Sequence, residues 1–406
     1  MISDQITKRD RNRYELLRML QRQGPLRRSE LSRECHVRIS SIISLTDELI
    51  AEGLVTLNEP DRPRSPLTFT SDRWFVVTGA VMADRIEFAQ VGLDGQVYNY
   101  TRQAISNRAS AQTLQAALFQ GLDAQRTLCP GRLLGMGIAL TGIVDPAPGL
   151  WHSAIHFPAV NSVSLAPDME ALLGCPVMVE NDARASLWGA LWFEPRLAAL
   201  SNVVYLSLCS GIGSALLIQG HLHTGTHCYA GELGHMRAGE EGRLCCCGKS
   251  DCLETYCAIP ALAAELRRVE PLMNDEATPA DLAELIRTNP QAAEIADQAM
   301  ARLGRLLGAL ASYVDPDAIL LGEQEPALYE ALLPSLRHHI QQEFQGRGTE
   351  ALPIELVAAP EHAPQRGIAA MVINEAFRNT LSPLYRERPI FTANAPACAT
   401  STTDHF

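Results

Sequence analysis

The first twenty residues lack two features of secreted proteins, an apolar signal segment and a small-residue cleavage site. The chain also lacks an apolar run of membrane-spanning length. Its longest uncharged stretch, residues 197–231, is broken into strand-length pieces by Asn202, Ser207 and Gln219. We therefore expect a cytoplasmic protein. In that reducing compartment the 11 cysteines should be mostly thiols, and clustered cysteines favour metal binding over disulfides.

Positive charge is scarce in most of the chain. The 406 residues include 34 Lys/Arg and 46 Asp/Glu, a net charge of −12. Residues 1–66 hold 12 basic and 10 acidic residues, a balance of +2, which leaves 22 and 36, a balance of −14, for the rest. Because an acidic surface repels nucleic acid, any DNA contact should be confined to the amino-terminal segment.

The length and the apolar content of 47% predict more than one domain. We expect an amino-terminal head at residues 1–70, a first α/β lobe at 71–190 and a second α/β lobe at 191–385. The second lobe would include the cysteine-rich loop and the carboxyl-terminal helices. The polar residues 386–406 are expected to form a disordered tail.

The head has the sequence pattern of a winged helix-turn-helix. Residues 14–20 place apolar side chains at helical spacing before Gly24-Pro25. Two further helices are expected at 28–35, capped by Ser29, and at 40–50. A strand pair with a basic, proline-containing tip at 62–66 would form the wing.

In this motif the third helix enters the major groove of DNA by its amino-terminal end. The candidate DNA contacts are Arg38, Ser40, Ser41 and Ser44 around that helix, Arg27 and Arg28 at the second helix, and Arg62 and Arg64 in the wing. The alternative is a protein-interaction module whose arginines only keep it soluble. The wing and the local reversal of charge favour DNA binding, although a basic residue at position 44 would have been stronger support.

The rest of the chain alternates between strand and helix patterns. Strands are expected at 75–81, 86–91, 134–140, 177–179 and 318–322, and helices at 111–124, 183–191 and 298–313, with a second sheet-rich unit starting near residue 203. Two α/β units with mixed sheets predict a two-lobed architecture with a cleft between the lobes.

A short loop concentrates potential metal ligands. His235, Cys245, Cys247 and Cys252 lie on one glycine-bent segment and have the side chains that surround a tetrahedral Zn²⁺. Four protein ligands leave no open position for an activated water, so this zinc would be structural. Cys246 is expected to point away from the metal. The alternative is a set of reduced thiols buried for packing.

A polar constellation surrounds this loop. Asn181 and Asp182 follow a predicted strand, and an amide next to a carboxylate at the end of a strand is suited to binding sugar hydroxyls. Glu232 and Glu254 flank the loop, so a bound zinc would hold them with His235 on one wall of the cleft.

Several motifs resemble those of the ROK family, which contains repressors and sugar kinases. They are Gly137-Ile138-Ala139-Leu140-Thr141-Gly142-Ile143-Val144-Asp145, Glu180-Asn181-Asp182-Ala183, Gly211-Ile212-Gly213, Ala230-Gly231-Glu232-Leu233-Gly234-His235 and Cys252-Leu253-Glu254. The resemblance covers nearly the whole chain, although Asp251 replaces the usual glycine.

The resemblance implies an actin-like, ribonuclease H-like fold with two lobes around a sugar site. In the family's pattern, Asn181, Asp182, Glu232, His235 and Glu254 would contact a hexose-type sugar, with Asp182 at the position of the kinase base. The four candidate zinc ligands match the family position by position. Family repressors carry an amino-terminal winged helix-turn-helix that the kinases lack.

Two nucleotide-contacting motifs of the kinases are altered. Residues 80–84 read Ala-Val-Met-Ala-Asp where kinases have Asp-x-Gly-Gly-Thr, and Gly322-Glu323 replaces a Gly-Gly pair. Only the second phosphate turn, residues 209–213, is kept. The sequence therefore favours a sugar sensor over an enzyme. There are two alternatives. The chain could be an active sugar kinase with an added DNA-binding head, or its body could be only a dimerisation scaffold.

The combined interpretation is a transcriptional regulator, most simply a repressor of sugar-uptake or catabolism genes. Its partners would be operator DNA and a sugar or sugar-phosphate effector. The protein would form a homodimer or tetramer, and the effector would change the spacing of its paired heads. Some family repressors respond instead to a sugar-transport protein, and the sequence leaves that alternative open.

Overall fold

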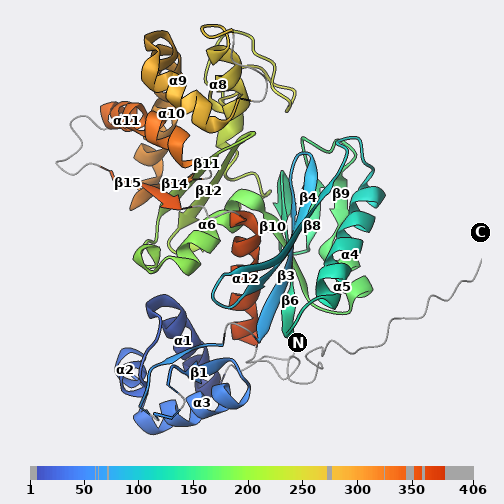
Figure 1. Ribbon diagram of the computed structural model, residues 1–406, viewed down its shortest axis with the longest axis vertical. Helices are drawn as coiled ribbons and strands as arrows, with labels where there is room; N and C mark the ends of the chain where they lie inside the picture. Colours follow the sequence, from blue (N-terminus) through green and yellow to red (C-terminus); the bar gives the residue numbers. More distant parts are fainter. Residues whose placement is uncertain are drawn as a thin grey trace, which may run out of the picture.

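A helical head and two α/β lobes make up the protein (Figure 1). The computed structural model describes residues 7–59, 61–62, 64–70, 73–271, 277–323, 325–343, 352–358 and 362–379. The expected disordered tail, residues 386–406, lies outside them. Within these ranges, no helix combines the length and the apolar character needed to cross a membrane.

The head is a winged helix-turn-helix, as expected. Its elements are α1 (Lys8–Gln23), α2 (Arg28–Glu34), α3 (Ile39–Ala51) and the antiparallel strands β1 (Val55–Leu57) and β2 (Leu67–Phe69). Leu16, Leu31 and Leu45 contribute to a buried core. Helix α2 begins at Arg28, as expected, but its expected cap was wrong: the N-cap is Arg27 rather than Ser29, and the carboxylate of Glu30 accepts a 2.6 Å hydrogen bond from the backbone N–H of Arg27.

The first lobe is built on a five-stranded sheet with the order β10-β6-β3-β4-β5. Three strands are parallel and two continue as an antiparallel meander. The strands are β3 (Trp74–Val81), β4 (Arg85–Gly92), β5 (Val97–Ala104), β6 (Arg132–Leu140) and β10 (Val177–Asn181). Helices α4 (Ala111–Thr127) and α5 (Ala166–Leu173) cover one face. A small sheet, β7 (Ile143–Asp145), β8 (Leu150–Ser153) and β9 (Asn161–Ser164), follows β6 in the chain.

The second lobe repeats this sheet arrangement. Its order is β13-β12-β11-β14-β15, in which β11, β14 and β15 are again parallel and β12 and β13 continue as an antiparallel meander. The strands are β11 (Val203–Leu208), β12 (Ile212–Ile218), β13 (His221–Leu222), β14 (Ala318–Glu323) and β15 (Ile354–Ala358). One face packs against a helical layer that includes α7 (Glu254–Cys257), α8 (Ile259–Leu266), α9 (Pro279–Thr288), α10 (Pro290–Val314) and α11 (Pro326–Glu343).

Two helices lie between the sheets, α6 (Asp182–Phe193) and α12 (Ala363–Asn379) (Figure 1). Helix α6 packs on β11 and β12 of the second sheet, whereas α12 packs on β3 and β6 of the first. The expected assignment of the carboxyl-terminal helices to the second lobe therefore fails for α12, because its apolar side chains, such as Ile368 and Val372, contact the first sheet. The expected boundary at residue 190 also falls inside α6 rather than between elements.

The two central helices approach each other closely. A Cβ atom placed on Gly189 of α6 would lie 2.8 Å from the Cα atom of Gly367 in α12, and a Cβ on Gly367 would overlap the carbonyl oxygen of Ala185. Real Cβ atoms do not approach other atoms this closely, so the crossing depends on two positions without side chains. It holds the first lobe to the second.

We expect Gly367→Ala to lower the free energy of unfolding by about 1–3 kcal/mol, because the added methyl overlaps backbone atoms that cannot move independently. Urea denaturation followed by circular dichroism measures the change. Ala293→Ser, a similarly small change at an exposed position of α10, is the control and should stay within about 0.5 kcal/mol. Equal stability of Gly367→Ala and the unmodified chain would mean that the crossing is loose.

Candidate functional site

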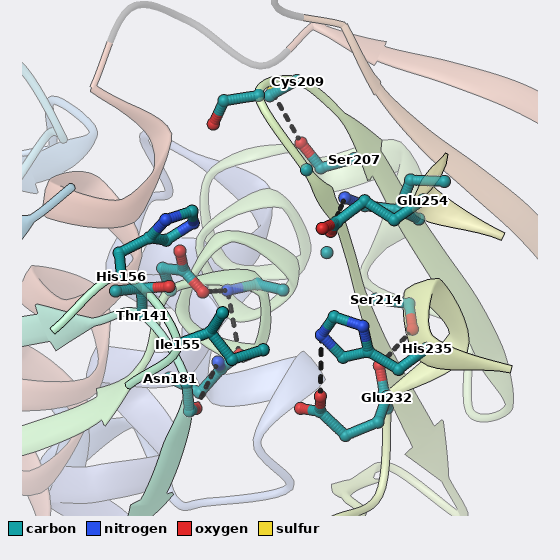
Figure 2. A pocket seen from close by; sticks show the side chains of 18 of the residues that line it. Thr141, Ile155, His156, Asn181, Ser207, Cys209, Ser214, Glu232, His235 and Glu254 are labelled. Carbon is teal, nitrogen blue, oxygen red and sulfur yellow. Dashed lines mark hydrogen bonds and ion pairs between the residues drawn. The ribbon is translucent and has the colours of Figure 1, made fainter. Parts of the chain in front are cut away.

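A cavity with a volume of about 150 Å³ lies between the lobes. Both walls are polar, and Figure 2 shows Asn181, Thr141 and His156 on one side and Glu232, His235, Ser214 and Glu254 on the other. Pockets for drug-sized ligands usually measure roughly 300–1,000 Å³. A cavity of this size and polarity suits one small polar molecule such as a monosaccharide.

Asn181 is fixed in the first-lobe wall by its place in the fold. It ends β10 and caps α6, so its Oδ1 accepts hydrogen bonds from the backbone N–H groups of Ala183 (3.0 Å) and Arg184 (3.1 Å). Its Nδ2 donates to the carbonyl of Gly142 at 3.1 Å. Capping residues of this type satisfy backbone donors that the first turn of a helix leaves open. The amide is thereby immobilised beside the cavity.

Asp182, the first residue of α6, supplies the carboxylate of this wall. Its Oδ1 accepts a 2.8 Å hydrogen bond from the N–H of Ala183. Burial in the cleft, helped by the negative charge of Glu232, raises the pKa of Asp182 to about 6, although the hydrogen bond from Ala183 acts in the opposite direction. A carboxyl group with this pKa can exchange a proton with a ligand hydroxyl near neutral pH.

A buried ion pair that the sequence analysis did not single out supports this turn. Arg184 donates from Nε to Oε1 of Glu180 at 2.7 Å and from Nη2 to the carbonyl of Val144 at 2.8 Å. Glu180 Oε1 also accepts from the N–H of Asn181 at 2.7 Å. Glu180 lies in β10 and Arg184 in the first turn of α6, so the turn from strand to helix brings the two side chains together. The pair anchors the start of α6.

Glu232, His235 and Glu254 form the opposite wall. A short 3₁₀ turn, η2 (Leu233–His235), places Nε2 of His235 3.8 Å from Oε2 of Glu232 (Figure 2). Glu254 starts α7, and its Oε2 accepts a 3.1 Å hydrogen bond from the N–H of Ile212. This carboxylate sits against Gly211, where a Cβ would lie 2.6 Å from it. The three side chains come from two turns of the second lobe.

Four potential metal ligands converge behind this wall. The ligand atoms of His235, Cys245, Cys247 and Cys252 all lie within 4.8 Å of one another. His235 Nδ1 is 3.6 Å from Cys245 Sγ, and the sulfurs of Cys247 and Cys252 are 3.5 Å apart. Thiolates about 2.3 Å from a tetrahedral zinc are roughly 3.8 Å from each other. The donor set and its spacing therefore fit a tetrahedral ion.

The side chain of Cys246 lies apart from this cluster. It is exposed, and its sulfur lies 3.5 Å from Oε1 of Glu254 on the cavity side. Cys245, Cys246 and Glu254 also lie close enough to share an ion, but three ligands with one exposed member form a poorer site than the four-residue cluster. His235 links the metal cluster to the cavity, because Nδ1 faces the cysteines and Nε2 faces Glu232.

Other cavity residues have no signal in the sequence. Ile155 and His156 come from the segment between β8 and β9, and Ser207 and Ser214 from strands of the second lobe (Figure 2). Ile155 and His156 lie outside the recognised motifs, whereas Ser207 and Ser214 flank the turn at residues 209–213 but were not assigned a contact. Thr141 lies within a recognised motif but was not assigned a contact.

The expected DNA contacts occupy different environments in the head. Arg27, Arg38, Ser40, Ser44 and Arg64 are exposed, and Ser41 is half-buried. Arg62 is exposed and pairs with Glu59 at 2.9 Å. Arg28 instead bridges α2 and α3, since Nη2 lies 2.6 Å from Asp47 and Nε donates to Thr46 at 2.8 Å. Its guanidinium is thus engaged within the head.

One basic residue of this surface escaped the sequence analysis. Arg9, at the start of α1, donates from Nη2 to Oγ of Ser44 at 3.3 Å and also pairs with Glu48. It brings positive charge to the exposed face of α3, where the sequence has serine. Arg9 and Ser44 are 35 residues apart in the chain, so no local sequence pattern could predict their contact.

The two similar sheets with helices between them define the actin-like class of two-lobed folds, here with a winged helix-turn-helix at the amino terminus. The sequence pattern of the ROK family matches residues 81–375. The chain belongs to the ROK family. The expected fold class is confirmed.

Repressors are among its relatives over nearly the full length. The xylose repressor of Bacillus subtilis (strain 168) is 25% identical, covering 92% of this chain and 97% of the repressor. The DNA-binding transcriptional repressor Mlc of Escherichia coli (strain K12) is 24% identical, covering 91% and 94%.

Solved structures show the same fold. A ROK family transcriptional regulator described as a homologue of E. coli Mlc superposes with a TM-score of 0.75 at 22% identity, covering 92% of this chain and 98% of that one. A ROK glucokinase from Streptomyces griseus superposes with a TM-score of 0.63 at 23% identity, covering 73% and 98%. Kinases thus share the body of this protein.

We expect Asp182→Asn to raise the free energy of unfolding at neutral pH by about 2–3 kcal/mol, since one pKa unit corresponds to 1.36 kcal/mol. Asp182 has a higher pKa in the folded than in the unfolded chain, so its stabilising effect is present below about pH 4 and is lost as the pH rises through 6. Asn resembles the protonated acid and does not titrate.

The free energy of unfolding of Asp182→Asn should exceed that of the unmodified chain by an amount that grows by about 1 kcal/mol between pH 5 and pH 7. Urea denaturation at each pH measures this difference. Asp168→Asn, on α5 and away from the cavity, serves as the control. If the difference in the free energy of unfolding between Asp182→Asn and the unmodified chain does not change with pH, the raised pKa of Asp182 is wrong.

Proposed function

We propose that this protein is a sugar-responsive transcriptional repressor that binds operator DNA through its head and a sugar through the cavity between its lobes. The observation that carries the proposal is a pair of helices, α6 and α12, that contact both the cavity and the head. The full-length similarity to repressors named for xylose regulation and for DNA binding supports it.

The cavity supports the sugar-binding part. Asp182, Glu232 and Glu254 provide hydrogen-bond acceptors, and the amide of Asn181 and the Nε2–H of His235 add donors, from two facing walls. Sugar hydroxyls both donate and accept hydrogen bonds, so such a set can hold several of them at once. We assign these five residues as the sugar contacts.

The turn after β3 supports a binding role without phosphoryl transfer. Kinases must hold the nucleotide phosphates in place, because positioning and charge neutralisation provide most of the catalysis. Here the backbone N–H of Met82 donates to the carbonyl of Arg85 at 2.9 Å within a tight hairpin, and the Met82 side chain lines the cavity. An apolar side chain at this turn would disfavour a nucleotide's phosphates, which supports a sensor over a kinase.

We also propose that the four-residue cluster holds a structural Zn²⁺. His235, Cys245, Cys247 and Cys252 would be its ligands, and the ion would fix the loop that carries Glu232 and Glu254. Burial among neighbouring thiols raises the pKa of Cys252 to about 12, so metal binding must displace its proton.

Helix α6 links the cavity to the head. Its amino-terminal end carries Asp182, and its last turns carry Trp192, whose ring lies 4.3 Å below the guanidinium of Arg18 in α1. Gln21 of α1 donates to the carbonyl of Trp192, and Arg22 donates to the carbonyl of Ala198 at 2.7 Å. A movement of α6 would therefore be transmitted to the first helix of the head.

Helix α12 makes a second link. Pro364 near its start lines the cavity, and Asn374 near its end accepts a 2.9 Å hydrogen bond from the hydroxyl of Tyr14 in α1. The ring of Phe377 stacks on Phe69 of the wing with centroids 5.5 Å apart. The head, the first sheet and both central helices share one hydrophobic core.

The junction of head and body contains imperfectly paired polar groups. Among the described residues, four of its buried atoms have no hydrogen-bond partner: Arg18 Nη1, Gln21 Oε1, Trp188 Nε1 and Trp192 Nε1. Each such group costs roughly 1–3 kcal/mol. We propose that a second arrangement of the head satisfies some of them and that sugar binding favours this arrangement, which would give allosteric control by the sugar.

Helix-turn-helix proteins usually bind paired half-sites one helical turn or a multiple apart. We therefore propose a homodimer or tetramer, in which sugar binding changes the spacing of two heads and lowers affinity for the operator. A sugar-transport protein that contacts the body would act on the same junction and is the second source of control.

The purified protein should contain about one zinc per chain by atomic emission spectroscopy, and Cys252→Ser should contain almost none, because it removes a buried ligand. Cys246→Ser is the matched control and should keep its zinc, since that sulfur lies outside the four-residue cluster. A zinc-free preparation of the unmodified chain, or loss of zinc from Cys246→Ser alone, would contradict the assignment.

Operator DNA selected from a random library should bind the protein, and one member of a panel of xylose, glucose, N-acetylglucosamine, N-acetylmannosamine and allose should weaken that binding. Coupling free energies of about 1–3 kcal/mol correspond to a five- to 150-fold change. Fluorescence anisotropy measures it. Tyr14→Phe should keep the sugar-free affinity within about twofold and reduce the sugar effect, because it removes the hydroxyl that contacts Asn374.

Tyr313→Phe, an exposed tyrosine on α10, is the control for this substitution and should respond to sugar normally. Failure of every sugar to change operator binding would overturn the sensor proposal. Rapid, sugar-dependent consumption of ATP by the same preparation would instead identify a kinase. Normal regulation in Asp182→Ala would support the scaffold alternative.

A further inference from the structure

The exposed face of α3 is unusually apolar for a helix placed to contact DNA. Ile39 and Ile43 are 46% and 43% exposed, whereas the apolar residues on the other side of the helix, such as Ile42 and Leu45, are buried. Positions four residues apart lie on the same side of a helix, so the two isoleucines form one continuous stripe next to Ser40 and Ser44. The core of the head does not account for this stripe.

The same helix lacks the side chains that usually read bases. Its sequence, ISSIISLTDELIA, contains no Arg, Lys, Asn or Gln. Those residues make the paired hydrogen bonds that identify guanine and adenine in the major groove. Serine hydroxyls bind either a donor or an acceptor and discriminate weakly. The only strongly selective surface on α3 is therefore the isoleucine stripe.

The surroundings of the stripe favour DNA as its partner. Arg38 precedes the helix and is exposed, and Arg27 and Arg64 are exposed elsewhere on the head. The two acidic residues of the exposed face are neutralised, since Asp47 pairs with Arg28 and Glu48 with Arg9. Figure 1 places α3 on the side of the head away from the lobes. An apolar stripe with arginines around it matches a groove lined by phosphates.

We infer that Ile39 and Ile43 read the 5-methyl groups of thymine in the major groove, so that each operator half-site carries A·T pairs beneath the amino-terminal half of α3. The thymine methyl is the one apolar group that the major groove presents, and aliphatic side chains recognise it by contact. Serines 40 and 44 and the arginines then supply hydrogen bonds and phosphate contacts. This inference rests on the DNA binding proposed above.

The test uses the full-length protein and a DNA site selected from a random library. Affinity is compared between that site and the same site with each thymine of the half-site replaced by deoxyuridine, which removes only the methyl group. At the contacted positions the replacement should weaken binding about three- to fivefold per methyl, as expected for burial of one such group.

Ile43→Ala should bind the thymine site more weakly and should no longer distinguish thymine from deoxyuridine at its position. Leu172→Ala, an exposed leucine on α5 that is 61% exposed, is the matched control and should discriminate normally. Ile43→Val retains a branched aliphatic group and should keep part of the discrimination, which separates lost contact from a misfolded head.

Equal affinity for thymine and deoxyuridine sites, or selected half-sites without A·T pairs, would overturn the inference and leave the repressor proposal intact. Failure to select any sequence would overturn both. If Ile43→Ala dissociates into smaller oligomers in analytical ultracentrifugation while discrimination is unchanged, the stripe is a contact between copies of this chain and the inference is wrong.

Discussion

Helices α6 and α12 touch backbone to backbone where Gly189 meets Gly367, and this contact constrains the rest of the molecule. One helix packs on the second sheet and the other on the first, so the crossing is where the lobes are held together. Both helices also reach the head, so they connect the cavity to the head through packed side chains. Packed interiors change between discrete arrangements rather than deforming smoothly. A ligand that changes the angle between the lobes therefore has a short mechanical route to the head.

The imidazole of His235 lies between the candidate metal site and the cavity and could contact both. Its Nδ1 faces the cysteine cluster and its Nε2 faces Glu232 in the cavity. A metal on Nδ1 would fix the ring and leave the Nε2 hydrogen to be donated toward the cavity. A structural ion could in this way determine ligand orientation without taking part in chemistry. The same cluster of side chains would suit a kinase or a sensor, and the proposed distinction between the two rests on the turn around Met82.

Local sequence patterns predicted the elements but not their partners. The helices of the head, the strands that end at Leu140 and Asn181, and the ligand-rich loop follow from spacing within short segments. The position of α12 did not, because its sequence, APQRGIAAMVINEAFRN, has apolar residues on more than one side and does not indicate which sheet it packs on. Nor did the pairing of Arg28 with Asp47 or the approach of Arg9 to Ser44, which depend on how three helices meet. His156 reaches the cavity only because the lobes close over it.

A sugar can control the head only if it binds one arrangement of the lobes more tightly than the other. The five residues proposed as sugar contacts come from both walls, so a ligand that bridges them would gain its full set of hydrogen bonds at one closure angle. Among the described residues, buried atoms of Arg18, Gln21 and Trp192 at this junction have no hydrogen-bond partner within the protein. In the proposed mechanism, a second arrangement of the head would pair some of these atoms, and its free energy would then lie close enough to the first for a ligand to reverse the balance.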